Sequence, residues 1–192
     1  MNDKHIVLLG CGALGSHIML FGRNLEADWR VVDDDFVEQR NVASQFHVKQ
    51  HVRKNKAQAL QMTMRGFFDL KNIEAIPHRF TDVNADTLLQ EASIVLDAFD
   101  HGASRRLAQA VCNRLGVPLL HAALAADGMF GRVVWSERFI VDDETVIGQA
   151  TCEDGRHLPF ITRVASCAAE ALKAFLTDGT KRDYPVVVPT RS

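Results

Sequence analysis

The chain has 192 residues and a formal net charge of −2, with 22 lysines and arginines against 24 aspartates and glutamates. This length is enough for one domain with a substantial core, and the nearly balanced charge leaves no broad basic surface for a nucleic acid. Because no apolar run reaches the roughly 18 residues of a membrane span and the polar start lacks a signal-peptide core, we expect a cytoplasmic protein without a membrane partner.

An apolar strand followed by a glycine-rich turn is the first predicted feature. Residues 6–9 read Ile-Val-Leu-Leu, and Gly10, Gly12 and Gly15 follow with the spacing G-x-G-x-x-G before a helical apolar pattern. In nucleotide-binding folds such glycines make the turn, admit a phosphate and let the helix pack on the strand. A second strand runs into Asp33, close to the distance expected for the acid that holds a ribose hydroxyl. This order predicts a nucleotide site.

The rest of the chain alternates between helical and strand patterns. After the second strand, at 29–32, we expect in order a polar loop over 36–53, a helix over 54–70, a strand over 72–80, a short helix over 84–90, a strand over 93–96, a helix over 103–115 and a strand over 118–123. Two antiparallel strands over 128–136 and 137–142, a polar loop over 143–156, a helix over 157–176 and a tail over 177–192 follow. We therefore predict a single α/β domain over 1–192, a Rossmann-like, mostly parallel sheet flanked by helices, with an antiparallel strand pair toward the C-terminus.

Several charged residues stand where this fold collects ligands. Lys54 and Lys56 begin the second predicted helix, where two cations oppose the helix dipole unless an anion binds there. The alternative is that both are solvated surface lysines. Asp100 stands just beyond a buried strand, and therefore at the carboxyl edge of the sheet. Arg105 lies in the first turn of the next helix and needs an acid or a phosphate as partner, a need that an ion pair with Asp100 would meet.

Read together, these motifs resemble those of the ThiF/MoeB/ubiquitin-activating superfamily, over about residues 5 to 176. Members of that superfamily adenylate the carboxyl terminus of a small ubiquitin-like or sulfur-carrier protein. Besides the glycine turn, the matching motifs are D-x-D-x-V-E-x-x-N-x-x-x-Q at 33–45, K-A at 56–57, and D-x-x-D-x-x-x-x-R at Asp97, Asp100 and Arg105.

The resemblance implies a role for each matching position. The implied ATP-binding residues are Gly10, Gly12, Gly15, Asp33, Asp35, Asn41, Lys56 and Arg105. Among these, Lys56 would neutralise phosphate charge, and Asp100 would hold Mg²⁺, which prefers carboxylate and phosphate oxygens. The resemblance also implies a homodimer, because relatives commonly pair. His47, His101 and His121 are minor candidates for site contacts, since they lack metal-ligand spacing.

The sequence departs from the family pattern at two points. Ser44 stands where the family usually has an arginine, and no arginine precedes the first strand. Arg40, in the same loop, is our candidate for the missing catalytic cation.

Cysteine usage gives a further candidate and excludes a site type. The four cysteines show no C-x-x-C spacing, so zinc is not predicted. By resemblance, Cys152 stands near the position where some relatives have a cysteine that accepts the activated carrier. The adjacent Glu153 and Asp154 would raise the pKa of that thiol. The alternative is therefore a non-catalytic surface thiol.

Three functions fit these patterns. The leading prediction is an ATP-dependent adenylyltransferase that converts a carrier's C-terminal carboxylate into an acyl-adenylate. An NAD-dependent oxidoreductase is an alternative, because the glycine turn and Asp33 suit either nucleotide. The missing arginines favour a third reading, a non-catalytic or partner-dependent subunit with the same fold.

Overall fold

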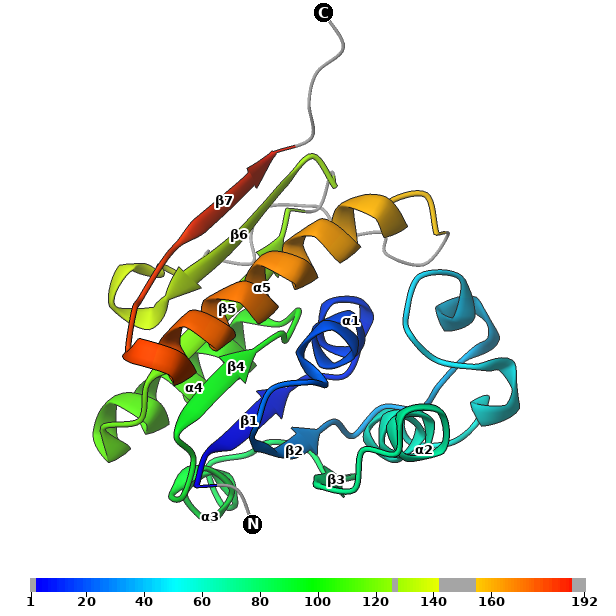
Figure 1. Ribbon diagram of the computed structural model, residues 1–192, viewed down its shortest axis with the longest axis horizontal. Coiled ribbons are helices and arrows are strands. Elements are labelled where there is room, and N and C mark those ends of the chain that lie inside the picture. The colour runs from blue at the N-terminus through cyan, green and yellow to red at the C-terminus, as the bar shows by residue number, and fades with distance from the viewer. Residues whose placement is uncertain (1–2, 126–127, 142–154, 188–192) are drawn as a thin grey trace, which may run out of the picture.

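The structure is a computed structural model that describes residues 3–125, 128–141 and 155–187. Within these residues the strands form a seven-stranded sheet in the order β3-β2-β1-β4-β5-β6-β7 (Figure 1). Their bounds are β1 His5–Leu9, β2 Asp28–Val32, β3 Ile73–Ile76, β4 Ile94–Asp97, β5 Leu119–Leu124, β6 Phe130–Trp135 and β7 Tyr184–Val187. The first five strands are parallel, and β6 runs antiparallel to β5 and to β7. The predicted fold class is confirmed.

Helices cover both faces of the sheet. The described α-helices are α1 Ala13–Gly22, α2 Lys56–Phe68, α3 Ala85–Leu89, α4 Gly102–Leu115 and α5 Leu158–Asp178. Side chains alternate along β1: Ile6 and Leu8 pack in one core with α1, α2 and α5, while Val7 and Leu9 pack with α3 and α4. A strand buried on both faces reads as a continuous apolar run, which is the pattern that this strand has in the sequence.

The direction of strand order changes at β1. From β1 the chain adds β2 and β3 on one side and then returns to place β4 and β5 on the other (Figure 1). Ligands of open α/β sheets bind at the carboxyl ends of the strands beside such a switch point. Here the ends are joined by backbone bonds from the Gly10 N–H to the Val32 carbonyl, at 2.9 Å, and from the Ala98 N–H to the Leu9 carbonyl, at 2.8 Å.

The antiparallel part of the sheet differs from the prediction in its strand partners. Residues 137–142 were expected to pair with 128–136, but a 3-10 turn occupies Ser136–Arg138 and no strand follows through residue 141. The side chain of Phe139 is buried and stacks on His121, with ring centroids 4.0 Å apart. The apolar residues in this segment are therefore explained by packing of Phe139 against β5, and not by a strand.

The strand that pairs with the outer side of β6 is β7. It lies within 177–192, which was expected from the sequence to be a tail. Trp135 at the end of β6 anchors this segment: its backbone N–H donates to Asp183 Oδ1 at 3.0 Å, and its indole N–H donates to the Arg182 carbonyl at 3.2 Å. Buried Val186 then packs with α5 in the core. The isolated sequence pattern of 184–187 is too short to reveal this docking.

The polar loop expected over 36–53 has local structure. It contains two short 3-10 helices, η1 at Gln39–Ala43 and η2 at Lys49–His51, and returns to form an antiparallel bridge between Phe36 and Asn55. The side chain of Asn55 then caps α2 by accepting the Gln58 N–H at 3.2 Å. Among the described helices, none combines the length and apolar character needed to cross a membrane.

Candidate functional site

The glycine turn between β1 and α1 is sterically specified. Gly10 has φ +91°, and a Cβ on it would stand 3.0 Å from the Ala98 carbonyl oxygen. A Cβ on Gly15 would stand 1.8 Å from the Gly10 carbonyl oxygen, so α1 can lie against the turn only with glycine there. Gly12, by contrast, faces open space, with nothing within 4 Å of a Cβ built on it.

The start of α1 is free to receive a ligand. Gly12 is its N-cap and supplies no side-chain cap. The first amides of an α-helix have no intrahelical acceptor, and together with the helix dipole they favour an anion. The open side of Gly12 thus lies beside donors that suit a phosphate group.

Asp33 joins β2 to this turn. Its Oδ2 accepts the backbone N–H of Cys11 at 2.6 Å, and its Oδ1 accepts the backbone N–H of Asp35 at 2.8 Å. Burial raises the pKa of Asp33 to about 6, while the charge of Lys56 and the two N–H bonds act in the opposite direction. The carboxylate is therefore part of the scaffold that joins the end of β2 to the glycine turn.

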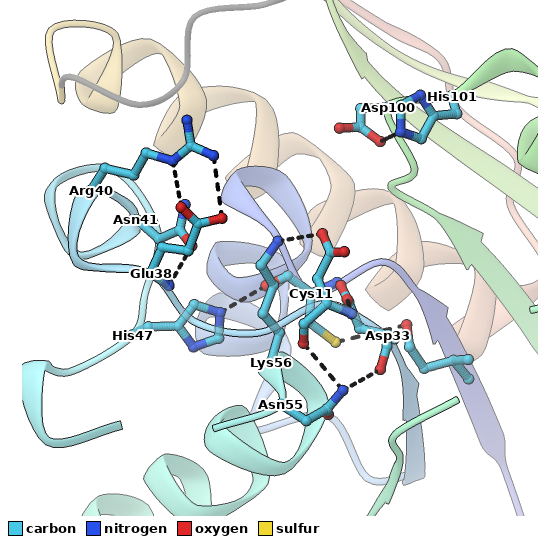
Figure 2. A network of polar contacts seen from close by, with 12 residues as sticks. Cys11, Asp33, Glu38, Arg40, Asn41, His47, Asn55, Lys56, Asp100 and His101 are labelled. Carbon is cyan, nitrogen blue, oxygen red and sulfur yellow. Dashed lines mark hydrogen bonds and ion pairs between the residues drawn. The ribbon is translucent and has the colours of Figure 1, made fainter. Parts of the chain in front are cut away.

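Lys56, at the first position of α2, points into the same site. Its Nζ donates to Asp35 Oδ2 at 2.8 Å, and only 11% of its side chain is exposed. Burial lowers the pKa of Lys56, but the charge of Asp33 and the charge and hydrogen bond of Asp35 outweigh burial, so this pKa is raised. Figure 2 shows Lys56, Asn55 and Asp33 converging near Cys11.

Asn55 was not among the predicted site residues, although it determines how the acidic turn lies. Its Nδ2 donates to the carbonyls of Asp33, at 2.8 Å, and Asp35, at 3.1 Å. The sequence does contain a signal for Asn55, because an asparagine just before an amphipathic helix is a typical N-cap.

The predicted residues Asn41 and Arg40 lie on η1. Asn41 is buried, and its Oδ1 accepts the Glu38 N–H at 2.8 Å as half of a capping box. Arg40 forms two hydrogen bonds with the Glu38 carboxylate, at 2.8 and 3.2 Å. In Figure 2 this pair lies to one side of Lys56, with the guanidinium directed at Glu38.

The predicted metal ligand Asp100 follows β4 and is open to solvent. Its carboxylate is 85% exposed and lies 3.5 Å from His101 Nε2. Across the site, one oxygen each from Asp33, Asp34 and Asp35 can lie within 4.8 Å of one another. Carboxylate oxygens are the donors that Mg²⁺ takes together with phosphate, so the chemistry of these residues fits the ion.

Arg105 forms its ion pair with a different acid from the one that the sequence suggested. It is buried and pairs with Asp97, Nη1 to Oδ2 at 3.0 Å, instead of with Asp100. It also donates to the carbonyls of Phe99 and, at 3.2 Å, Ala122. The guanidinium is thus held inside the protein beneath the loop that carries Asp100.

Two of the histidines contact this framework from inside. His47 is buried, its Nε2–H donates to the Cys11 carbonyl at 2.9 Å, and burial lowers its pKa to about 4. His121 is fully buried, with Nδ1 2.6 Å from Asp97 Oδ2. Ser44 is also buried, and its Oγ has no hydrogen-bond partner within the described ranges.

The cysteines add no described nucleophile to this edge. Cys152 lies outside the described residues. Cys11 lies in the glycine turn, but it is fully buried, and burial raises the pKa of its thiol well above the ordinary value. A buried thiol of this kind behaves as a small apolar side chain.

Comparisons with known proteins identify the family of this chain. The ThiF family model matches residues 1–183. The SAMP-activating enzyme E1 of Haloferax volcanii is 30% identical over 124 residues, covering 64% of this chain and 46% of that protein. The sulfur carrier protein ThiS adenylyltransferase of Bacillus subtilis is 26% identical over 174 residues, covering 86% of this chain and 52% of that protein.

A solved structure has the same fold at lower identity. The crystal structure of E. coli MccB with ATP superposes with a TM-score of 0.79 and 16% identity, covering 97% of this chain and 61% of that one. The chain spans about half the length of the curated relatives described above. With a family model matched over residues 1–183, the chain belongs to the ThiF family.

Proposed function

We propose that this protein is an ATP-dependent adenylyltransferase that activates the C-terminal carboxylate of a small ubiquitin-like or sulfur-carrier protein. The observation that carries the proposal is the position of Lys56, whose Nζ lies 2.8 Å from Asp35 at the edge of the sheet where the glycine turn ends β1. A shielded cation beside an open glycine turn suits a triphosphate better than a dinucleotide. The names of the relatives, a sulfur-carrier adenylyltransferase and a SAMP-activating enzyme, support this substrate class.

The proposed reaction transfers an adenylyl group. A carboxylate oxygen of the carrier bonds to the α-phosphorus of ATP, the bond from that phosphorus to the oxygen bridging to the β-phosphate breaks, and pyrophosphate leaves with the electron pair. Such a displacement mainly requires alignment and positive charge on the phosphate oxygens. The amides at the start of α1 and the Lys56 amine would supply both.

Four further side chains have an assigned part in this proposal. Asp33 would accept a hydrogen bond from the ribose, and Asp35 and Asn41 would line the nucleotide pocket. Asp100 would hold Mg²⁺, which when bound supplies charge neutralisation at the phosphates. Asp35 would also keep Lys56 directed at the site before nucleotide arrives. The proposal includes a homodimer, which light scattering of the purified chain tests.

Arg40 is proposed as the cation that takes the place of the usual family arginine. It would have to leave Glu38 to reach a phosphate, so Glu38→Gln should raise the affinity for ATP and Arg40→Ala should lower the rate of pyrophosphate exchange. Undiminished exchange by Arg40→Ala eliminates this role. Because an exposed ion pair of this kind contributes about 0 to 1 kcal/mol, neither change should unfold the chain.

The deciding experiment compares ligands by thermal stabilisation. A ligand that binds the native state raises the melting temperature, so we expect ATP with Mg²⁺ to stabilise the chain and NAD or NADH to leave it unchanged. Asp100→Ala should remove the Mg²⁺-dependent part of the shift. Glu91→Ala, which changes an exposed carboxylate before the amino end of β4, is the matched control and should behave as the unmodified chain.

The other outcomes identify the alternatives. Stabilisation by NAD alone overturns the proposal in favour of an oxidoreductase. Absence of any shift moves the assignment to a partner-dependent subunit, which the burial of Ser44 at the usual arginine position favours. A positive result leads to pyrophosphate exchange with candidate carrier proteins, in which incorporation of labelled pyrophosphate into ATP reports adenylate formation.

A further inference from the structure

Three buried charged or polar side chains form a network behind the candidate site. Asp97 at the end of β4 accepts from Arg105 on α4, at 3.0 Å, and lies 2.6 Å from His121 Nδ1 on β5. Asp97 and His121 are both fully buried, and 9% of Arg105 is exposed. The ring of Phe139 covers the network by stacking on His121 and lying 5.6 Å from the guanidinium of Arg105.

The network grips the peptide that precedes Asp100. The backbone N–H of Phe99 donates to Asp97 Oδ1 at 2.9 Å, and the carbonyl of Phe99 accepts from Arg105 Nη2. The preceding N–H, of Ala98, donates to the Leu9 carbonyl at 2.8 Å. Three polar groups of the backbone, the Ala98 N–H and the N–H and carbonyl of Phe99, are therefore held before the chain reaches Asp100.

Asp100 itself has little else to hold it. Its carboxylate is 85% exposed, and the contact described for it is the 3.5 Å approach of His101, whose side chain is 72% exposed. Its charge nevertheless acts on the site, because it contributes to the raised pKa of Lys56. The peptide between Phe99 and Asp100, one side of which Arg105 holds, thus sets the backbone position from which this carboxylate extends.

The same loop also forms a wall of the glycine turn. A Cβ on Gly10 would stand 3.0 Å from the Ala98 carbonyl oxygen and 3.3 Å from the Phe99 nitrogen. A shift of the loop would therefore alter the floor of the proposed phosphate site as well as the position of Asp100.

We infer that Arg105 is a positioning residue for Asp100 and not a ligand of the nucleotide. Its guanidinium acts through the Phe99 carbonyl and Asp97 to keep the Asp100 carboxylate at the site edge. The inference rests on the proposed function in one respect, namely that Asp100 serves Mg²⁺-bound ATP. The placement of the loop by Arg105 stands on the hydrogen bonds alone.

The test is a double-mutant cycle between Arg105→Lys and Asp100→Ala, read as the Kd for ATP in Mg²⁺. Lysine keeps the charge, but its three N–H donors share one nitrogen and lack the planar fork with which the guanidinium reaches Asp97 and two carbonyls together. We expect Arg105→Lys alone to weaken binding by about tenfold and to have less than about a twofold effect in the Asp100→Ala background, because coupled residues are not additive. Arg30→Lys is the matched control: Arg30 also bonds a carboxylate, Glu74, and a carbonyl, Leu88, but it lies on β2 away from Asp100.

A second measurement, amide hydrogen exchange, needs no nucleotide. In the unmodified chain the Phe99 amide should exchange only through global unfolding, and in Arg105→Lys the segment 98–101 should exchange faster while β1 stays protected. An equal loss of ATP affinity in both backgrounds overturns the inference, as does rapid exchange of Phe99 in the unmodified chain. If the unmodified chain does not bind ATP with Mg²⁺, the proposed function fails, and slow exchange of Phe99 that Arg105→Lys abolishes still supports the placement of Asp100 by Arg105.

Discussion

The backbone N–H of Cys11 donates to Asp33 Oδ2 at 2.6 Å, so the acid at the end of β2 is bound to the glycine turn at the end of β1. A second N–H, from Asp35, binds the other oxygen at 2.8 Å. The Asp33 carboxylate therefore accepts hydrogen bonds from two backbone N–H groups, and in the proposed function it would also bind the nucleotide. Its protonation affects both the stability of the fold and the proposed binding.

Asp33 gives a prediction for the pH dependence of stability. Burial raises its pKa to about 6 from the usual 3.8, so the folded chain binds this proton more readily than the unfolded chain. The stability that it contributes is present below about pH 4 and is lost as the pH rises through about 6. We expect the free energy of unfolding of the unmodified chain, relative to Asp33→Asn, to fall by about 1 to 3 kcal/mol from pH 4 to pH 7. Urea denaturation at four pH values measures this, and a rising difference would contradict it.

Lys56 gives a prediction that does not depend on the function. Its charge opposes the rise in the pKa of Asp33, so Lys56→Met should move that pKa further upward, as carboxyl carbon NMR titration would show. Lys54→Met, at an exposed position two residues earlier, should leave it unchanged. For the proposed function, only Lys56→Met should also weaken ATP binding, by about tenfold or more. An unchanged titration of Asp33 would mean that the two charges do not interact.

Two glycines of the turn should respond differently to alanine. Gly15→Ala places a methyl group 1.8 Å from the Gly10 carbonyl oxygen, and we expect a loss of about 1 to 3 kcal/mol or more in unfolding free energy. Gly12→Ala meets nothing within 4 Å and has φ −77°, so its stability should change by less than about 1 kcal/mol while ATP binding weakens.

The control for this pair is Gly66→Ala on the exposed side of α2. A Cβ at Gly66 also meets nothing within 4 Å, and it should stabilise the helix by about 0.5 to 1 kcal/mol without altering ligand binding. Retention of full ATP affinity by a folded Gly12→Ala chain would contradict phosphate binding at the open side of Gly12.

A role of Cys152 in carrier transfer can be tested separately from the adenylation step. If this thiol accepts the activated carrier, Cys152→Ala should keep pyrophosphate exchange and lose the carrier adduct, which mass spectrometry without reductant detects. Cys167→Ala, in α5, is the control and should keep both. Loss of exchange in Cys152→Ala, or persistence of the adduct, would contradict the transfer role.

The placement of the candidate residues at one edge of the sheet was predictable because parallel strands carry local signals. Buried strands read as apolar runs, and whatever follows each run reaches the same edge of the sheet. Gly10, Asp33 and Asp100 each follow such a run in the sequence, and the structure places each of them just beyond the end of a strand, β1, β2 and β4 in turn. The order of the elements also predicted the fold class.

The partners of individual side chains were less predictable. The expected pairing of Arg105 with Asp100 relied on nearness in sequence. In the structure Arg105 instead forms an ion pair with Asp97, the last residue of β4. Likewise 137–142 looked like the neighbour of β6, but β7 was brought to that edge from more than 40 residues further along the chain. Sequence spacing contains no information on which of two close acids points inward.

The sequence by itself determined the family, the glycine turn and the elements up to β6, because periodicity and turn chemistry are local properties of the chain. Only the tertiary structure decided that Asp33 binds the turn, that Lys56 is shielded beside Asp35, and that Arg105 lies under the Asp100 loop. These depend on strand register and helix packing, which bring together residues far apart in sequence. Burial then raises the pKa of Asp33 to about 6 and makes each of these contacts matter more than it would in water.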